Sequence, residues 1–280
     1  LDSINGQFID ESAGIQLKAG SHVRMAGHIA GADGRLSADF EGVLWARLFD
    51  SEQTVTCKNN AGAKQAFTYK DRTSVLYNTQ DSVRQGRFSF SFILPVDINY
   101  SDDARRVVFY ALDATQRAEA NGYSEAFTLG GVSDEVGADT AGPAVFAYLN
   151  DEEFQDGGVV NAQPFFVALL EDESGVNVSG NGLGHDLSLC IDGRADMTFN
   201  LNDYYAGEFG DFRRGSVAFS LPTLEAGPHS LTFRAWDVFN NTSTTALSFF
   251  VDPALKPRMF NLTASQNPAT TATNFLVSYS

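Results

Sequence analysis

The stretch Arg87-Phe-Ser-Phe-Ser-Phe-Ile-Leu94 decides the fold class of this chain. Every second residue from Phe88 to Leu94 is apolar, which is the pattern of a strand with one buried face. The same alternation returns at 217–221 and 231–235, and no ten-residue window combines helical apolar spacing with matching caps. The sequence therefore predicts a nearly all-β protein.

Strand-like segments fall into two groups, joined by the polar segment from Gly130 to Pro143. Its glycines, acidic residues and X-Pro bond disfavour both helix and strand, so we expect a linker with a boundary near residue 138. The second group places seven short strands in roughly 110 residues, which is typical of an immunoglobulin-like sandwich. The predicted strands are 23–29, 43–49, 66–69, 87–94, 107–112 and 125–129 in the first group, and 144–149, 165–170, 187–191, 197–201, 216–221, 231–236 and 246–251 in the second.

Three regions follow from this pattern. We predict a β-sandwich domain at 1–138, an immunoglobulin-like β-sandwich domain at 139–252, and a final region at 253–280. Prolines mark a linker at the start of the final region, and 273–279 has the composition of a strand that stops at Ser280. We interpret this region as a linker and the first strand of a truncated third β module.

Charge and hydropathy exclude two classes of function. The chain has 280 residues, 43% of them hydrophobic, and 19 basic against 35 acidic residues give a net charge of −16. Nucleic acid is therefore not expected as a partner, because phosphates would be repelled. No apolar run reaches the length of a membrane helix. The chain opens at Leu1 without a leader peptide, so we expect targeting signals to have been removed or to lie upstream.

A cysteine peptidase needs a thiolate beside an imidazole, and this chain offers Cys57 and Cys190 with four histidines. The two cysteines belong to different predicted domains, so we expect buried free thiols rather than a disulfide. His185 and Cys190 are five residues apart, an odd offset that points side chains to opposite faces of a strand. We predict no catalytic residue. The remaining histidines are His22, His28 and His229.

The segment Gly182-Leu-Gly-His-Asp186 has the glycines of a phosphate-binding loop, but no helix follows to present its N–H groups to an anion. We interpret it as a β-turn entering a strand, with His185 hydrogen-bonded to the loop itself. Asp192-Gly193 is expected to form a tight hairpin. Further along, Asp237 is expected to bond the backbone of a turn while Trp236 packs beside it.

Oxygen-bearing side chains cluster at 97–103 and at 150–153, and such loops hold calcium in extracellular β modules. An EF-hand would need a glycine and a later acidic residue where this chain has Asp102 and Val108. We therefore expect solvated acidic loops, and we predict no metal-binding and no cofactor-binding residue.

Aromatic residues make up 12% of the chain, with 23 Phe and 2 Trp, a balance that favours core packing over ligand stacking. Trp45 and the pair Tyr204 and Tyr205 could form a sugar-stacking platform. They equally suit sandwich cores with one polar edge, and we expect the core role.

Several clusters carry a resemblance to a known family. Gly182–Asp186, Leu201-Asn-Asp-Tyr-Tyr205 and Ala235-Trp-Asp-Val-Phe-Asn-Asn-Thr-Ser243, in that order, resemble the region that follows the peptidase domain in PorU-type sortases. These are gingipain-like cysteine peptidases of the bacterial type IX secretion system. The resemblance extends to 88–100, to the passage between 122 and 143, to Asp172-Glu-Ser-Gly-Val-Asn177 and to 224–231, and it covers about 67–267.

In this family a cysteine–histidine peptidase domain precedes the β modules, and it is implied to remove sorting domains from cargo and to join the new end to lipopolysaccharide. None of its active-site residues matches a position of this sequence. The resemblance implies a non-catalytic accessory region on the outer face of the outer membrane. Its implied partners are the upstream peptidase domain and an outer-membrane β-barrel. The alternative is an independent surface adhesin or carbohydrate-binding module.

Overall fold

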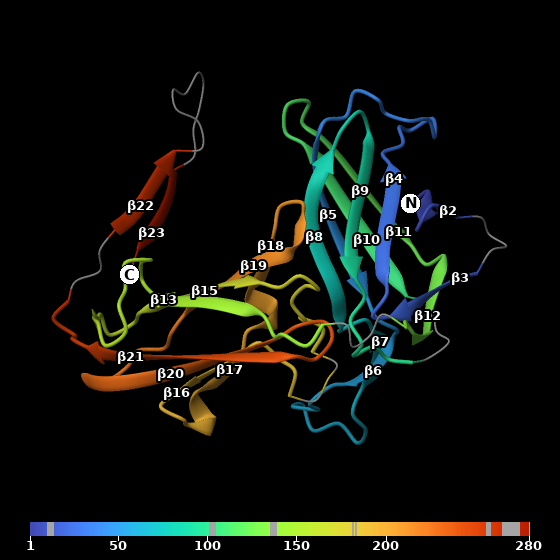
Figure 1. The fold of residues 1–280 in the computed structure, drawn as a ribbon. Coiled ribbons are helices and arrows are strands. Elements are labelled where there is room, and N and C mark those ends of the chain that lie inside the picture. Colours follow the sequence, from blue (N-terminus) through green and yellow to red (C-terminus); the bar gives the residue numbers. More distant parts are fainter. Residues whose placement is uncertain are drawn as a thin grey trace.

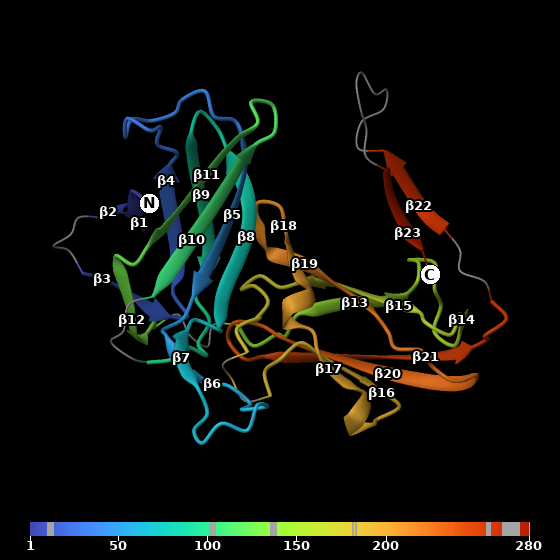
Figure 2. The same ribbon diagram turned by 180° about the vertical axis from the view of Figure 1, so that it is seen from behind.

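The computed structural model describes residues 1–9, 14–100, 105–134, 139–180, 182, 184–255, 259–264 and 275–279. Strands dominate these residues, and the helical elements among them are the short 3-10 turns η1 (Ala195–Met197) and η2 (Asn202–Tyr204). Two β-sandwiches follow one another along the chain, with their strands running crosswise to each other (Figures 1 and 2). The predicted all-β fold class is confirmed. No helix in the described part is long and apolar enough to cross a membrane.

The first sandwich consists of two four-stranded sheets and a two-stranded closure. Its sheets have the orders β2-β1-β4-β9 and β11-β10-β5-β8, and the parallel pair β12-β3 closes one end. The strands are β1 (Ser3–Ile4), β2 (Gln7–Phe8), β3 (Ile15–Ala19), β4 (His22–His28), β5 (Gly42–Phe49), β8 (Val75–Val83), β9 (Arg87–Ile93), β10 (Arg106–Asp113), β11 (Ala118–Ser124) and β12 (Phe127–Val132).

The alternation that predicted β9 places its phenylalanines in the first core. Phe88, Phe90 and Phe92 are each at most 6% exposed, and the ring of Phe92 stacks on Tyr77 with centroids 4.2 Å apart. Burying rings of this size is a leading source of folding free energy in a β-sandwich. The core therefore lies where the sequence pattern placed it.

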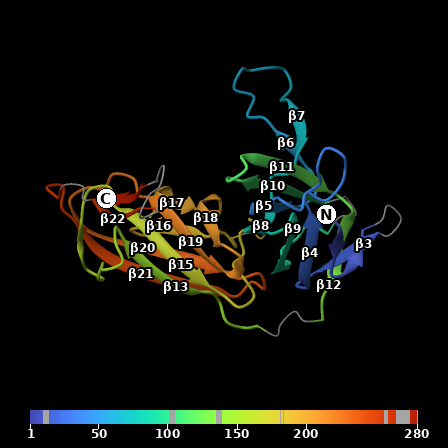
Figure 3. The same ribbon diagram turned by 90° about the horizontal axis from the view of Figure 1, so that it is seen from above.

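One hairpin leaves the first sandwich, and we call residues 53–72 the projecting hairpin. Its strands β6 (Gln53–Thr56) and β7 (Thr68–Asp71) pair only with each other, and every residue of β7 is exposed. Figure 3 shows it standing away from both sandwiches. Phe67, next to the loop that joins the two strands, is 70% exposed and stacks beside Tyr69.

The second sandwich has a four-stranded sheet β13-β15-β19-β18 facing a five-stranded sheet β14-β21-β20-β16-β17. Its core includes Phe166 and Phe233, which are 0% exposed with ring centroids 5.2 Å apart. The strands are β13 (Ala144–Leu149), β14 (Val159–Val160), β15 (Phe165–Glu171), β16 (Ser188–Ile191), β17 (Thr198–Asn200), β18 (Tyr205–Glu208), β19 (Asp211–Ser220), β20 (Gly227–Trp236) and β21 (Thr242–Val251).

The turn at Asp192-Gly193 forms as predicted, but the tight hairpin does not. Both residues have positive φ, 53° and 63°, and the N–H of Arg194 donates to the carbonyl of Ile191 at 3.0 Å. The chain then makes the 3-10 turn η1 before β17 begins, so strand pairing starts only at Cys190 opposite Thr198.

After the second sandwich, β22 (Met259–Ala264) and β23 (Phe275–Tyr279) form an antiparallel hairpin apart from both cores (Figure 1). The strand expected at 273–279 is thus present at 275–279, where it pairs with β22, and residues 273 and 274 lie outside the described part. The domain boundaries at residues 138 and 252 stay predictions.

Candidate functional site: the junction between the two sandwiches

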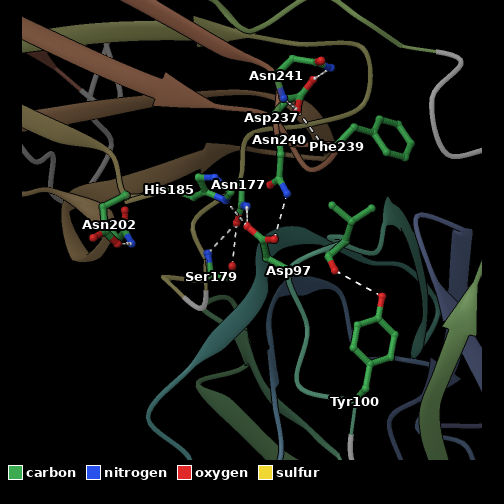
Figure 4. Close-up of polar contacts among 12 residues, drawn as sticks. Asp97, Tyr100, Asn177, Ser179, His185, Asn202, Asp237, Phe239, Asn240 and Asn241 are labelled. Carbon is green, nitrogen blue, oxygen red and sulfur yellow. Dashed lines mark hydrogen bonds and ion pairs between the residues drawn. The ribbon is translucent and has the colours of Figure 1, made fainter. Parts of the chain in front are cut away.

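Asp97 is the centre of the contact between the sandwiches. It follows β9 of the first sandwich, and its carboxylate reaches three side chains of the second (Figure 4). Oδ2 lies 2.5 Å from His185 Nδ1 and accepts from Asn177 Nδ2 at 3.5 Å, while Oδ1 accepts from Asn240 Nδ2 at 2.9 Å. The Asp97 side chain is 16% exposed and that of His185 is 25% exposed. Hydrogen bonds to a carboxylate this sheltered are stronger than those at an open surface.

The loop that carries His185 is shaped for this contact. A side chain at Gly182 would collide with both Asp97 and His185, since its first carbon would lie 2.2 Å and 2.3 Å from their polar atoms. The His185 ring packs on Trp236 with centroids 4.2 Å apart. The prediction that His185 bonds its own loop is therefore wrong for the side chain, which reaches the first sandwich instead. Its backbone N–H does close the turn, on the carbonyl of Gly182.

Asn202 ties this loop to the second sandwich. Its Nδ2 donates to Asp186 Oδ1 at 2.8 Å, and its Oδ1 accepts from the N–H of Leu187 at 2.8 Å. The three sequence clusters at 182–186, 201–205 and 235–243 thus meet around one junction. Sequence reasoning grouped them without showing that they touch.

The loop that carries Asp97 is anchored inside the first sandwich by a buried ion pair. The side chains of Asp50 and Arg105 are both 0% exposed, with Oδ1 3.1 Å from Nε. The N–H of Asn99 donates to Asp50 Oδ2 at 2.9 Å, and Arg105 donates to the carbonyl of Asn99. Because Ile98 is buried in the core between Asp97 and Asn99, the loop presents Asp97 outward from a fixed base.

Two further contacts fix the relative orientation of the sandwiches. The N–H of Val96 donates to the carbonyl of Val238 at 2.9 Å, and Val238 is 4% exposed. At a separate point the N–H of Gly210 donates to the carbonyl of Gln80 at 2.8 Å, so the β18–β19 hairpin sits against β8. Phe212 of β19 packs against the first core.

Three carboxylates lie close together beside the junction, outside the two loops that were considered for calcium. Ligand oxygens of Asp139, Asp172 and Asp237 all lie within 4.8 Å of one another. Burial raises the pKa of Asp172 to about 6, with the neighbouring Asp237 and Asp139 adding to the rise, and burial also raises the pKa of Asp237. Carboxylate oxygens are hard-cation ligands, and the cluster carries electrostatic strain when all three are ionised.

The turn role predicted for Asp237 is confirmed. Its Oδ1 accepts from the N–H groups of Phe239 and Asn241 at 2.9 and 2.7 Å, and Asn241 Nδ2 donates to its Oδ2 at 2.7 Å (Figure 4).

The loops singled out for calcium have other roles where they are described. Asp97 serves the junction, and residues 101–104 lie outside the described part. Asn150 Oδ1 accepts from the N–H of Phe165 at 2.9 Å, and Asp151 caps the N–H of Glu153.

The cysteines are free, as predicted, but neither is fully buried. Cys57 is exposed in the projecting hairpin, and Cys190 is half-buried with Sγ 3.6 Å from the carbonyl of Arg194. The core position expected for these thiols is wrong. For Cys57 the reason is that strand alternation does not reveal that β6 and β7 form a separate two-stranded sheet. Of the other histidines, His22 packs edge-on against Phe212, His28 bonds Asp2 and His229 bonds Asp192.

Of the aromatic residues considered for sugar stacking, Trp45 and Tyr205 line one cleft between the sandwiches, whereas Tyr204 does not. Tyr205 is half-buried beside β8, Tyr204 is 49% exposed against Phe219, and Trp45 lies on the outer face of β5 with Tyr110 5.6 Å away. Trp45 is therefore not a core residue, contrary to expectation, since the core side of β5 carries Leu44, Ala46 and Leu48.

No protein-family model matches the sequence, and no curated protein matches it. Among solved structures the chain is similar to dimeric latent PorU from Porphyromonas gingivalis, at 32% identity and a TM-score of 0.55. The match covers 99% of this chain and 26% of that one, so the chain spans about a quarter of the length of the PorU chain it matches. This establishes a PorU-like relationship for the β region.

Weaker structural matches are to native alpha-2-macroglobulin of E. coli and to red sea bream transglutaminase. The first has 11% identity and a TM-score of 0.26, covering 90% of this chain and 17% of that one. The second has 11% identity and a TM-score of 0.25, covering 89% and 31%. Neither score supports a conclusion on function.

Proposed function

We propose that this chain is the non-catalytic β region of a gingipain-like sortase of the type IX secretion system, where it positions the peptidase domain and docks partners. The similarity to PorU supports the family. In this proposal the cysteine–histidine chemistry belongs to an upstream domain, and residues 1–280 are not themselves an enzyme.

The junction around Asp97 carries the positioning role. Neighbouring domains move relative to each other by default unless their interface is extensive. Here the carboxylate network, the Val96–Val238 backbone bond and the Gly210–Gln80 backbone bond hold the sandwiches at separated points. Contacts at several points resist rotation as well as separation. The two sandwiches therefore act as one rigid arm, which transmits the position of one end to the other.

We further propose that this arm stands on the outer face of the outer membrane against a β-barrel partner. Two surfaces suit docking. The edge strand β13 pairs on one side only, with β15, and so leaves backbone groups for strand addition. The projecting hairpin adds exposed Phe67 and Tyr69 beside basic residues such as Lys70.

The positioning role is tested with Asp97→Ala in the full-length parent protein, expressed in a strain that lacks its own copy. Cargo that keeps its sorting domain is expected to accumulate, because the arm becomes flexible. Small-angle scattering of residues 1–280 with the same substitution is expected to show a larger radius of gyration. The matched control is Asp33→Ala, an exposed aspartate whose nearest cation lies at 3.9 Å.

Two outcomes count against this reading. If scattering changes but cargo processing stays normal, the rigid junction exists without a positioning role. If neither changes, the junction does not hold the sandwiches together.

The upstream coding sequence of the parent gene distinguishes the sortase from the alternative, an independent surface adhesin or carbohydrate-binding module. A gingipain-like histidine and cysteine several hundred residues upstream supports the sortase. A leader peptide directly before Leu1 favours the adhesin.

A further inference from the structure

A shallow cleft lies where the β18–β19 hairpin of the second sandwich meets the outer face of the first. Its volume is about 380 Å³, at the small end of the range of roughly 300–1,000 Å³ for ligand pockets. The floor is the sheet β11-β10-β5-β8, and one wall is Tyr205, Ala206 and Gly207 of β18. The cleft is separate from the Asp97 network, and no cysteine or histidine lines it.

Strand register lays two rows of side chains across the floor. Trp45 of β5 stands opposite Tyr110 of β10 and Gln80 of β8. Next to this row, Arg47 stands opposite Val108 and Asn78. The first row therefore offers two aromatic rings and an amide, and the second offers a guanidinium, an amide and one apolar side chain.

Trp45 and Tyr110 lie at the surface of the first sandwich and not in its core. The Trp45 and Tyr110 rings have centroids 5.6 Å apart with planes inclined by 39°, and Tyr110 is 38% exposed. Their Cβ atoms leave the sheet on the side away from the first core, since Leu44, Ala46, Phe109 and Ala111 fill the inner side. Half-exposed rings on a rigid sheet give a ligand apolar contact at little entropic cost.

Strand pairing in the floor of the cleft indicates which kinds of ligand can bind there. β5 is paired on both sides, with β10 and β8, and β10 is paired with β5 and β11. β8 lies at the edge of the sheet, but its free side meets the β18–β19 hairpin, where the N–H of Gly210 donates to the carbonyl of Gln80. We therefore expect a ligand on the floor to be held by side chains. The one charged residue in the lining is Arg47, which is exposed and has no carboxylate partner among the described residues. Its planar guanidinium can donate several hydrogen bonds.

We propose that this cleft binds a neutral saccharide. The C–H face of a pyranose ring would stack on Trp45 and Tyr110, and its hydroxyls would exchange hydrogen bonds with Arg47, Asn78 and Gln80. A neutral ligand fits because the chain as a whole carries a net charge of −16, which opposes anions. This inference does not rest on the proposed sortase role, since the cleft would serve an anchored or an independent protein alike.

The test is isothermal titration of the 280-residue chain with maltopentaose, cellopentaose, laminaripentaose and mannopentaose at millimolar concentrations. We expect saturable binding of at least one of them. Trp45→Ala is expected to weaken it tenfold or more, equivalent to about 1.4 kcal/mol. Arg47→Gln, which leaves the sheet packing intact, is expected to weaken it severalfold.

The controls separate the cleft from general effects. Tyr110→Ala in the cleft is compared with Tyr69→Ala in the projecting hairpin, because the two tyrosines are 38% and 42% exposed. Only the first is expected to lose binding. Thermal unfolding of every variant shows whether Trp45→Ala still folds, and Arg47→Gln carries the test if it does not. Absence of binding to all four sugars, or binding that Trp45→Ala, Arg47→Gln and Tyr110→Ala all leave unchanged, overturns the proposal.

Discussion

Removal of one partner of the buried Asp50–Arg105 pair is expected to be the most damaging single change among the residues that anchor the loop carrying Asp97. Both side chains are 0% exposed, and Asp50 also accepts from the backbone N–H groups of Ser51 and Asn99. Asp50→Ala leaves a buried guanidinium without its carboxylate. Removing one partner of such a pair costs about 3–5 kcal/mol, a large share of the roughly 5–15 kcal/mol that stabilises a domain.

The assay is urea unfolding followed by tryptophan fluorescence. The chain has two tryptophans, Trp45 in the first sandwich and Trp236 in the second, so Trp236→Phe leaves a reporter for the first sandwich alone. In this background Asp50→Ala is expected to lower the unfolding midpoint sharply. The double variant Asp50→Leu with Arg105→Met is expected to recover much of the loss, because no charge is then stranded.

The matched control is Asp196→Ala. Asp196 pairs with Arg194 at 2.5 Å, but their side chains are 68% and 57% exposed. Solvent-exposed ion pairs contribute little to stability, so little change is expected. A loss below about 1 kcal/mol for Asp50→Ala, or a double variant no more stable than the single one, would refute the reasoning from the stranded charge.

Two further predictions concern pH and thiol access. The pKa of Asp172 is about 6 in the folded chain and ordinary when unfolded, so between pH 4 and 6 the folded state holds the extra proton and stability falls as pH rises. Asp172→Asn is expected to flatten this dependence, worth at most about 3 kcal/mol, in unfolding followed at pH 4 and pH 8. An unchanged slope contradicts the pKa rise that burial causes and that Asp237 and Asp139 increase. Cys57 is expected to react with a thiol reagent in the native state faster than Cys190, and equal rates would contradict the exposed projecting hairpin.

Much of the fold could be predicted from alternation, because strands with one face in a core leave a clear period of two. β5, β9, β10, β13 and β15 are examples, each found close to its expected bounds. β8 was missed because only Leu76 and Val83 of its nine residues are both apolar and buried, and its outer side meets β18 rather than the core. Short strands such as β1 and β14 carry too few residues for a period to show.

The junction could be predicted only in part. Turn chemistry identified the role of Asp237, since a side chain that bonds its own turn is a local matter. The partnership of Asp97 with His185 joins positions 88 residues apart, and no local pattern encodes it. The one available signal was Gly182, whose absent side chain makes room for that pair. The convergence of Asp139, Asp172 and Asp237 likewise depends on how the linker packs on two separate turns.

The parallel pairing of β3 and β12 has a mechanical consequence. Ile15 pairs with Phe127 and Ala19 with Val132, so the two strands lie side by side and run in the same direction, one near the start and one near the end of the segment that forms the first sandwich. A pull applied at Ile15 and Val132 acts on opposite ends of this pair and loads its hydrogen bonds in shear, all at once. In an antiparallel hairpin such as β20–β21 the same pull opens one bond after another. The first sandwich is thus built to resist tension applied along the chain between these two strands.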